Sequence, residues 1–315
     1  MNMVVSKSNR PEILVLMSVY NGQEFLDKQL ESIEKQKNVN IDLLIRDDGS
    51  SDESIEIINK WSTTLNITVS VGQNIGAKNS FLKLIEQCPD GYDYYAFADQ
   101  DDYWMPDKLE VAVQKLTTLK DDKPSLYYST AILVDEKLER INNPFKKQYH
   151  TEKFNETIVF TGGAGCTMVW DRKMLHFLKK HYPDYCLMHD EWILHVCSAI
   201  GGNIVYDPQP HMLYRQHTCN VVGGINKLKY NKVQLLVYRI KKFFDFNYKP
   251  ANVCNEILNG YKGDMPYENQ MLAEKIVKSK KSFFTRMTIL VSRKYRTKYW
   301  IYNLKFKVQL ILNKL

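Results

Sequence analysis

The sequence predicts an α/β protein with a mixed, mainly parallel β-sheet flanked by helices, followed by a basic helical extension. Three observations predict this class. Apolar, β-prone segments alternate with amphipathic helical patterns through the first hundred residues, as in βαβ units. Polar residues directly follow several of these strands. From about residue 225 onwards the pattern is helical, basic and aromatic. A chain of 315 residues with 44% hydrophobic residues is long enough to bury a sizeable core.

The first part of the chain is predicted from hydrophobic periodicity. Period-2 apolar runs indicate strands, and apolar residues three or four positions apart indicate helices. The predicted strands cover residues 12–20, 41–47, 66–72 and 92–99, and the helices between them cover residues 24–36, 54–63 and 78–88.

The elements that follow are less regular. Pro106 suits the first turn of a helix over residues 106–119, and residues 125–135 read as a strand. We expect a polar loop over residues 137–157 and a glycine-rich turn entering a strand over residues 161–170. Helices are predicted over 172–181 and 189–201, and one or two short strands over 203–217.

Cysteine usage and hydropathy bear on the cellular compartment. Six cysteines are irregularly spaced and form no CxxC pair, which indicates reduced thiols in a cytosolic protein rather than a zinc site. No apolar run reaches the ~20 residues needed to span a bilayer. The sequence therefore predicts a cytoplasmic protein.

Charge is unevenly distributed along the chain. Residues 225–315 contain 20 Lys and Arg against 5 Asp and Glu, whereas residues 1–224 contain 23 against 31. The basic tail segment over residues 280–315 interleaves cations with aromatic and aliphatic residues, which suits a helix lying on an anionic membrane surface. The alternatives are a helical subdomain packed on the body and a nucleic-acid-binding tail, for which no recognition motif is present.

Polar side chains are expected to converge at one edge of the predicted sheet. In open α/β sheets, ligands bind beyond the carboxyl ends of the strands. The residues that follow the first four strands are Asn21 and Gly22, Asp47 with Asp48 and Gly49, Asn74 with Gly76, and Asp99 with Asp101.

The segment DDGSSD, residues 47–52, follows the second strand. A tight turn and a helix N-cap explain Gly49, Ser51 and Asp52. Two successive aspartates before the glycine are not required by that explanation. A carboxylate at this position can accept a hydrogen bond from a nucleobase imide N–H.

The segment Asp99–Gln100–Asp101–Asp102 is the stronger signal, because it ends a β-prone, apolar strand. Alternate carboxylates can bind one hard cation such as Mg²⁺ or Mn²⁺ together with substrate phosphates. A solvated loop with Asp102 near the N-terminus of the following helix is the alternative. Helix capping accounts for at most one of the acids.

Taken together, these motifs resemble the inverting family-2 glycosyltransferases of the GT-A fold. The resemblance rests on residues 17–33, DDGSSD, NIG at 74–76 and FADQDD at 97–102 with Pro106 downstream, and it covers about residues 11–225. TGGAGCTMVW, MHDEW and YRQH are most like the bacterial rhamnosyltransferase-type branch. The implied organisation is a glycosyltransferase domain over 1–225, with a nucleotide-sugar-binding half (11–110) and an acceptor half (111–225), and a basic C-terminal region over 226–315.

The resemblance implies a role for each matching position. Asp48 would bind the donor's base, and the backbone at Val19 and Tyr20 would cradle the base and ribose. Asp99 would face the ribose and the metal, and Asp101 would be the main ligand of Mn²⁺ or Mg²⁺. The donor site would also include Asn21, Asn74 and Gly76.

The general base is assigned to Asp190 on the same resemblance. An inverting transfer needs one carboxylate to take the proton of the acceptor hydroxyl. The sequence here is His189–Asp190–Glu191, which departs from the usual acid–Asp pair and leaves Glu191 as a rival. The helix N-terminus would favour the ionised form of either carboxylate. Helix capping is the alternative role for Asp190.

Three further assignments follow from YRQH and the glycine-rich turn. His217 could complete the metal site, and Arg215 could hold diphosphate oxygens. Gly162 and Gly163 would leave room for an acceptor sugar, and the alternative is that the backbone requires glycine there.

The resulting functional prediction is an inverting transfer of rhamnose from dTDP-rhamnose to a hydroxyl of a growing, lipid-linked surface polysaccharide, at the inner face of the cell membrane. A UDP-hexose donor is the alternative, followed by a nucleotidyltransferase or a non-catalytic nucleotide-sugar-binding protein. The QxxRW motif of processive synthases is absent. One sugar per binding event is therefore expected, with no nucleic acid as partner.

Overall fold

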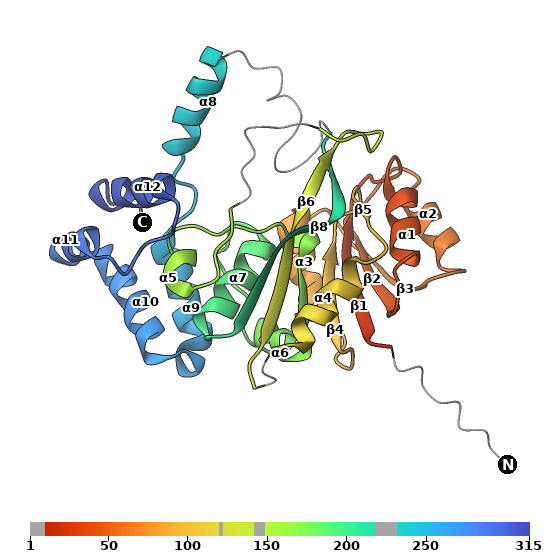
Figure 1. Ribbon diagram of the computed structural model, residues 1–315, viewed down its shortest axis with the longest axis horizontal. Coiled ribbons are helices and arrows are strands. Elements are labelled where there is room, and N and C mark those ends of the chain that lie inside the picture. The colour runs from red at the N-terminus through yellow and green to blue at the C-terminus, as the bar shows by residue number, and fades with distance from the viewer. Residues whose placement is uncertain (1–9, 120–121, 142–148, 218–231) are drawn as a thin grey trace.

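A computed structural model describes residues 10–119, 122–141, 149–217 and 232–315 (Figure 1). Its described part contains an eight-stranded sheet in the order β3-β2-β1-β4-β7-β6-β8-β5. The strands are β1 (Glu12–Val19), β2 (Asn40–Asp47), β3 (Asn66–Val71), β4 (Tyr94–Ala98), β5 (Tyr103–Trp104), β6 (Ser125–Val134), β7 (Val169–Asp171) and β8 (Asn203–Arg215).

The helices lie on both faces of this sheet and in a C-terminal group. They are α1 (Leu26–Glu34), α2 (Ser54–Trp61), α3 (Gly76–Gln87), α4 (Lys108–Thr117), α5 (Phe154–Thr157), α6 (Arg172–Lys180), α7 (His189–Ala199), α8 (Lys232–Phe243), α9 (Pro250–Tyr261), α10 (Tyr267–Ser279), α11 (Phe283–Val291) and α12 (Trp300–Ile311). Short 3₁₀ turns cover Gly165–Thr167 and Lys262–Asp264.

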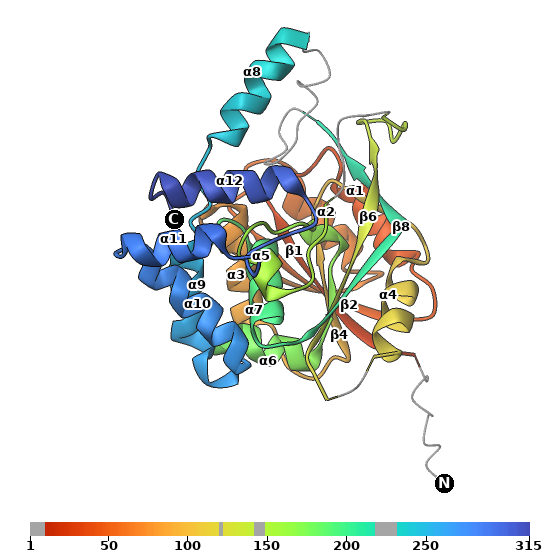
Figure 2. The same cartoon turned by 60° about the vertical axis from the view of Figure 1, so that its left-hand side comes forward.

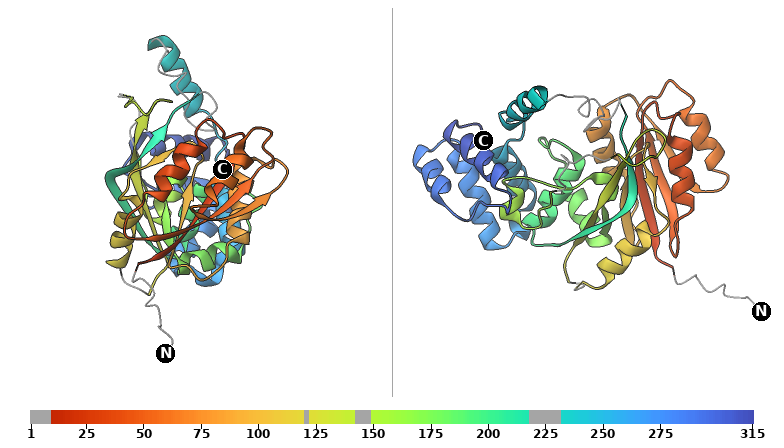
Figure 3. Two further views of the ribbon diagram at one scale, coloured as in Figure 1. Left: turned by 90° about the vertical axis from the view of Figure 1, so that its right-hand side faces the viewer. Right: turned by 45° about the horizontal axis from the view of Figure 1, so that its top comes forward.

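The central strand β1 is buried on both faces, because successive side chains of a strand point to opposite sides. Ile13, Val15 and Met17 join one hydrophobic cluster, and Leu14 and Leu16 join the other. Helices α1, α2 and α4 cover the first cluster, and α3, α6 and α7 cover the second. The right-hand view of Figure 3 shows the strands between the orange N-terminal helices and the blue C-terminal ones. The predicted α/β class is confirmed.

The sheet is parallel in its first half and mixed in its second. Strand β1 pairs in parallel with β2 and β4, and β2 with β3, whereas β7 is antiparallel to both β4 and β6. Strand β8 runs parallel to β6 and antiparallel to β5. The predicted order of strands and helices over the first hundred residues matches the structure.

Two local predictions need correction. Residues 203–215 form one long strand, where one or two short strands were predicted, and the register with β6 shifts beside Ser129 and Thr130. Pro208 and Pro210 lie there and have no N–H for the ladder, so a bulge absorbs the interruption. Helix α4 begins at Lys108, after Pro106 rather than with it.

The C-terminal helices share a hydrophobic core with the sheet. Ile257 of α9, Ile276 of α10 and Phe306 of α12 belong to the same buried cluster as Leu16 and Trp170. Figures 1 and 2 both show α9, α10, α11 and α12 gathered beside α5 and α7. Packing on the body, the alternative for the basic tail, is therefore what α9–α12 do. The division at residue 225 stays a prediction.

None of the helices over the described residues is both long and apolar enough to cross a membrane. The five cysteines in this part, Cys88, Cys166, Cys186, Cys197 and Cys254, are buried free thiols, and Cys219 lies outside the described residues.

Replacing a core residue of α12 tests whether the C-terminal helices support the whole fold. Phe306 is 2% exposed and Leu304, on the same helix, is 43% exposed. Phe306→Ala should lower the free energy of unfolding by about 3–5 kcal/mol, through lost burial and a cavity. Leu304→Ala is the matched control, with an expected loss of about 1 kcal/mol or less. Urea denaturation measures both, and equal effects would contradict the shared core.

Candidate active site

The loops that follow β1, β2 and β4 meet at the carboxyl ends of these parallel strands. The first two loops are joined by several hydrogen bonds. The N–H of Asn21 donates to Ser50 Oγ at 3.0 Å, and Asn21 Oδ1 accepts the N–H of Ser51 at 2.9 Å. The N–H of Gly22 donates to Ser54 Oγ at 2.8 Å. Asn21 has a φ of +48°, a region that asparagine tolerates better than most residues. The predicted convergence of polar residues at this edge is therefore present.

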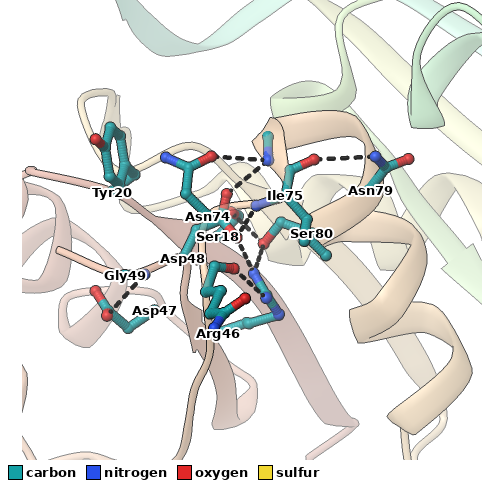
Figure 4. Close-up of polar contacts among 12 residues, drawn as sticks. Ser18, Tyr20, Arg46, Asp47, Asp48, Gly49, Asn74, Ile75, Asn79 and Ser80 are labelled. Carbon is teal, nitrogen blue, oxygen red and sulfur yellow. Dashed lines mark hydrogen bonds and ion pairs between the residues drawn. The ribbon is translucent and has the colours of Figure 1, made fainter.

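Asp48 lies at the base of this edge, with only 2% of its surface exposed. Its carboxylate forms an ion pair with Arg46 and accepts the N–H groups of Ile75 and Gly76, both at 2.9 Å (Figure 4). Arg46 also donates to Ser80 Oγ at 3.1 Å. The carboxylate thus joins the end of β2 to the N-terminus of α3.

This arrangement bears on the predicted donor-binding residues. Tyr20 is 47% exposed next to Asp48, and Asn74 Oδ1 accepts the N–H of Gly76 at 3.1 Å. Gly76 has a φ of +78°, so a side chain there would be strained. Tyr20, Asn74 and Asp48 lie close together at one edge (Figure 4), and the N–H of Gly76 lies 2.9 Å from Asp48 Oδ2. Recognition of the nucleobase by Asp48 stays a prediction. Arg46, which forms an ion pair with Asp48, was missed by sequence reasoning.

Gln100 joins the first loop to the acidic segment. Its Oε1 accepts the N–H of Tyr20 at 2.8 Å, and its Nε2 donates to the carbonyl of Tyr20 at 3.1 Å. A Cβ on Gly22 would lie 2.6 Å from Gln100 Oε1, so a side chain at that position would displace the Gln100 amide. The amide therefore sets the position of the β1 loop, next to Val19, relative to Asp99 and Asp101. The sequence pattern alone gave this residue no role.

Strand β8 brings His217 to the acidic segment, because β5 pairs with it directly beside that segment. His217 Nε2 lies 2.6 Å from Asp101 Oδ2. The Phe25 ring packs against His217, with ring centroids 4.9 Å apart. The predicted neighbourhood of Asp101 and His217 is thus found, although the two residues are 116 positions apart in the chain.

Arg215 is also beside the acidic segment but is held by backbone carbonyls. Its Nε donates to the carbonyl of Asp101 at 2.7 Å, and a guanidinium N–H donates to the carbonyl of Glu136. The guanidinium carbon lies 4.6 Å from the centroid of the Phe25 ring. In this structure Arg215 therefore supports the loop that contains Asp101. Contact of Arg215 with a diphosphate stays a prediction.

The loop alternative expected Asp102 to lie at the N-terminus of the next helix and cap it. In the structure Asp102 does not cap that helix. It is fully buried, and its Oδ1 accepts the N–H of Arg215 at 3.2 Å. The side chains of Asp99, Asp102 and Cys166 present atoms that all lie within 4.8 Å of one another. Burial, with the charges of Asp101 and Asp99, raises the pKa of Asp102 well above its usual value.

Lys108 lies beside this buried cluster. It is 1% exposed, and its ammonium lies 3.4 Å from the centroid of the Trp104 ring. Burial lowers the pKa of Lys108 to about 7, and the charges of Asp102 and Asp99 oppose that shift. Sequence reasoning missed both Lys108 and Cys166. A lysine two residues after a proline, at the start of an amphipathic helix, reads as an exposed residue.

The electrostatics around Asp99 fit a bound divalent cation. Burial, then the charges of Asp101 and Asp190, raise the pKa of Asp99 to about 7. Negative charge from three carboxylates thus accumulates at one point. Asp101 contacts His217, but the cluster of potential ligand atoms within 4.8 Å of one another in the described residues is formed by Asp99, Asp102 and Cys166. Binding of Mn²⁺ or Mg²⁺ by Asp99, Asp101 and His217 together therefore stays a prediction.

Asp190 lies in the first turn of α7 and faces this cluster. Its Oδ2 accepts the N–H of Gly165 at 3.0 Å, and its Oδ1 accepts the N–H of Glu191 at 2.8 Å. A Cβ on Gly165 would lie 2.7 Å from His189 Nε2 and 3.1 Å from Asp190 Cβ. Glycine is therefore needed at 165 to let α7 begin this close to the loop.

Glu191 lies in surroundings that disfavour its ionised form, whereas a general base must be ionised to accept a proton. Burial and the adjacent Asp190 raise the pKa of Glu191 to about 8, and a hydrogen bond with Thr161 opposes the shift only in part. The expectation that the helix N-terminus keeps either carboxylate ionised is therefore wrong for Glu191. At neutral pH its carboxyl group holds a proton, which favours Asp190 as the base.

The glycines assigned to the acceptor have structural surroundings. A Cβ on Gly162 would lie 2.2 Å from the carbonyl oxygen of Tyr149. Gly163 has a φ of +147°, and a Cβ there would lie 3.1 Å from Met168 Cε. The alternative, that the backbone requires glycine, is supported at both positions. Contact with an acceptor sugar stays a prediction.

Comparisons with known proteins bear on the family of the chain. Residues 14–176 match the family model of glycosyl transferase family 2. The dTDP-rhamnosyl transferase RfbG of Shigella flexneri is 32% identical over 269 residues, covering 79% of this chain and 90% of that protein. The Escherichia coli glucosyltransferase WfgD, described as acting with UDP-Glc on alpha-D-GlcNAc-diphosphoundecaprenol, is 28% identical over 56% of this chain and 67% of its own length.

Solved structures share the fold. The structure of S. aureus TarS 1-349 in complex with UDP-GlcNAc superposes with a TM-score of 0.56 at 15% identity, covering 95% of this chain and 81% of that one. At this identity the likeness establishes the GT-A fold, and the fold predicted from the sequence is confirmed.

The pH dependence of stability tests the state of Glu191. Its pKa is about 8 in the folded chain and near 4.5 when unfolded, so the folded state retains a proton that the unfolded state has lost. The free energy of unfolding should therefore fall, relative to Glu191→Gln, as the pH rises from 5 to 8. Urea denaturation at several pH values measures the difference.

Glu56→Gln, at an exposed position of α2, is the matched control and should run parallel to the wild type. If Glu191→Gln also runs parallel to the wild type, then Glu191 is ionised at neutral pH and remains a rival for the base.

Proposed function

The chain belongs to glycosyl transferase family 2, and we propose that it is an inverting rhamnosyltransferase that uses dTDP-rhamnose as donor. The acceptor is a hydroxyl of a growing, lipid-linked surface polysaccharide. The observation that supports the reaction most directly is the proximity of Asp190 to Asp99, whose pKa is raised by burial and then by the Asp101 and Asp190 charges. The base thus lies next to the predicted donor and metal residues.

The geometry supports a single-displacement mechanism. The acceptor oxygen attacks the anomeric carbon, the bond from that carbon to the diphosphate oxygen breaks, and the nucleoside diphosphate leaves with the electron pair. Asp190 takes the acceptor proton on a carboxylate oxygen. The hydrogen bonds from Gly165 and Glu191 N–H groups hold that carboxylate in place. Inversion at the anomeric carbon follows from one displacement without a covalent intermediate.

Donor binding is assigned to the edge of the sheet where the loops after β1, β2 and β4 meet, which we call the donor rim. Tyr20 presents an exposed ring for the base, and Asp48 with Arg46 forms the polar wall behind it. Asp99, Asp101 and His217 would hold Mn²⁺ or Mg²⁺, which when bound neutralises charge on the diphosphate. Gln100 keeps the two halves of this rim together through the backbone of Tyr20.

The choice of donor rests on the comparisons. RfbG is a dTDP-rhamnosyl transferase and matches over 90% of its length, which supports rhamnose as the donor sugar. A UDP-hexose is the alternative, because WfgD is a UDP-Glc transferase. The lipid-linked acceptor is also proposed by analogy, since WfgD acts on a diphosphoundecaprenol-linked sugar.

A nucleotide panel tests the donor and the cation. Thermal unfolding is measured with dTDP, UDP and GDP, each with Mn²⁺ and with a chelator. We expect dTDP with Mn²⁺ to raise the Tm most, because a ligand that binds only the folded state stabilises it by mass action. Asp101→Asn should lose the Mn²⁺-dependent part, and Glu56→Gln should keep it. A larger shift with UDP would favour the alternative donor, and equal shifts with chelator would reject the metal.

Replacing the base tests the mechanism. Asp190→Asn should reduce transfer by about 10²–10⁴-fold, because the acceptor proton has no carboxylate to accept it. The Tm shift with dTDP and Mn²⁺ should survive, which shows that the variant still folds and binds the nucleotide. Glu191→Gln is the matched control and should retain most of the activity. If Glu191→Gln loses transfer while Asp190→Asn keeps it, the roles are reversed.

A further inference from the structure

Helix α8 exposes a continuous apolar stripe. Val233, Leu236, Val237 and Ile240 recur at the spacing that places side chains on one face of a helix, and Phe244 extends the stripe one turn further. The N–H of Phe244 donates to the carbonyl of Ile240 at 3.1 Å, so the helical hydrogen bonding continues to it. These five side chains are between 45% and 70% exposed.

The stripe is not covered by the described part of the chain. None of the described side chains of α8 is buried, in contrast to every other helix of the C-terminal group, each of which buries at least one residue. Figures 1 and 2 both show α8 standing away from the body. A 12-residue helix is marginally stable alone in water, and its stability in a protein comes from burying its apolar face. An external surface that covers the stripe would supply that burial.

The charge on α8 identifies the chemistry of that surface. The helix contains Lys232, Arg239, Lys241 and Lys242 and no acidic residue. The region from residue 225 to 315 carries 20 cationic against 5 anionic residues. Pairing of α8 with the same helix of a second copy would bring like charges together. An apolar stripe flanked by cations fits the boundary of an anionic lipid layer, where the side chains enter the acyl region and the cations meet the headgroups.

The base of α8 is attached to the packed helices. Lys305 of α12 donates from Nζ to the carbonyl of Lys242 at 3.1 Å, and its ammonium lies 6.0 Å from the centroid of the Phe246 ring. In Figure 1, α8 projects at the end of the molecule toward which β1 runs, which is the end that carries the candidate active site.

We propose that α8 is a membrane-docking helix, which lies in the plane of an anionic lipid surface with Val233, Leu236, Val237, Ile240 and Phe244 inserted. The lipid surface is the occupant of the apolar stripe. The benefit of docking for catalysis rests on the proposed lipid-linked acceptor, whereas the docking itself does not.

The test is co-sedimentation of the full chain with vesicles of phosphatidylcholine alone and with phosphatidylglycerol added. The wild type should partition onto the anionic vesicles. Val237→Glu combined with Ile240→Glu should reduce the partition coefficient by about tenfold or more, because two inserted aliphatic side chains become charged. Gln234→Glu combined with Lys241→Gln is the matched control. It lowers the net charge by the same amount on the polar flank and leaves the apolar stripe unchanged. Its reduction of the partition coefficient should be less than a third of the reduction caused by Val237→Glu with Ile240→Glu.

Each outcome bears on the proposal. No wild-type binding to anionic vesicles, or equal losses for the two double variants, would overturn it, since charge alone would then account for binding. A lipid-free dimer that Val237→Glu with Ile240→Glu dissociates would overturn it in favour of a second copy as the occupant. The Tm shift with dTDP and Mn²⁺ is measured in the same variants. If that shift is intact while lipid binding fails, the docking proposal fails and the proposed transferase function does not.

Discussion

The constraint on which the site depends is the repulsion among carboxylates at the end of β4. Asp99, Asp101 and Asp102 follow this buried strand within four residues, and Asp190 approaches from α7. Burial makes their mutual repulsion stronger, because the low dielectric of the interior screens it poorly. Cations and N–H donors lie around these carboxylates, and burial, then the charges of Asp101 and Asp190, raise the pKa of Asp99 to about 7.

The positions of these compensating groups explain features of the fold that are otherwise arbitrary. Strand β8 is long because it pairs with β6 and β5 and still reaches past the acidic segment, where it places Arg215 and His217. Lys108 is buried at the start of α4, behind the same carboxylates, although burying a lysine is costly. Gly165 allows α7 to start within hydrogen-bonding distance of the glycine-rich loop. The side chains at this edge of the sheet therefore come from β4, β8, α4 and α7 and the loops next to them.

The donor side is organised by a separate, preformed network. Asp48 links the end of β2 to the start of α3, and Gln100 links the end of β1 to the acidic segment. These contacts use backbone N–H groups and carbonyls, so the loops are held in place before any ligand binds. A preorganised site of this kind avoids the entropy of ordering loops at the moment of binding. The C-terminal helices stabilise the same core from the other face, and leave α8 outside it.

The amino-acid sequence by itself determined the α/β class, the order of the first seven elements and the acidic segment at the end of β4. These depend on local periodicity and on residue types next to each other in the chain, which a single sequence contains. It also placed Asp101 and His217 in one site through the family resemblance. Tertiary structure alone decided that Asp102 accepts the Arg215 N–H, that Lys108 is buried beside it, and that Glu191 is protonated while Asp190 faces the site. The physical reason is that burial and long-range pairing set these properties, and neither can be read from the neighbours of a residue in the chain.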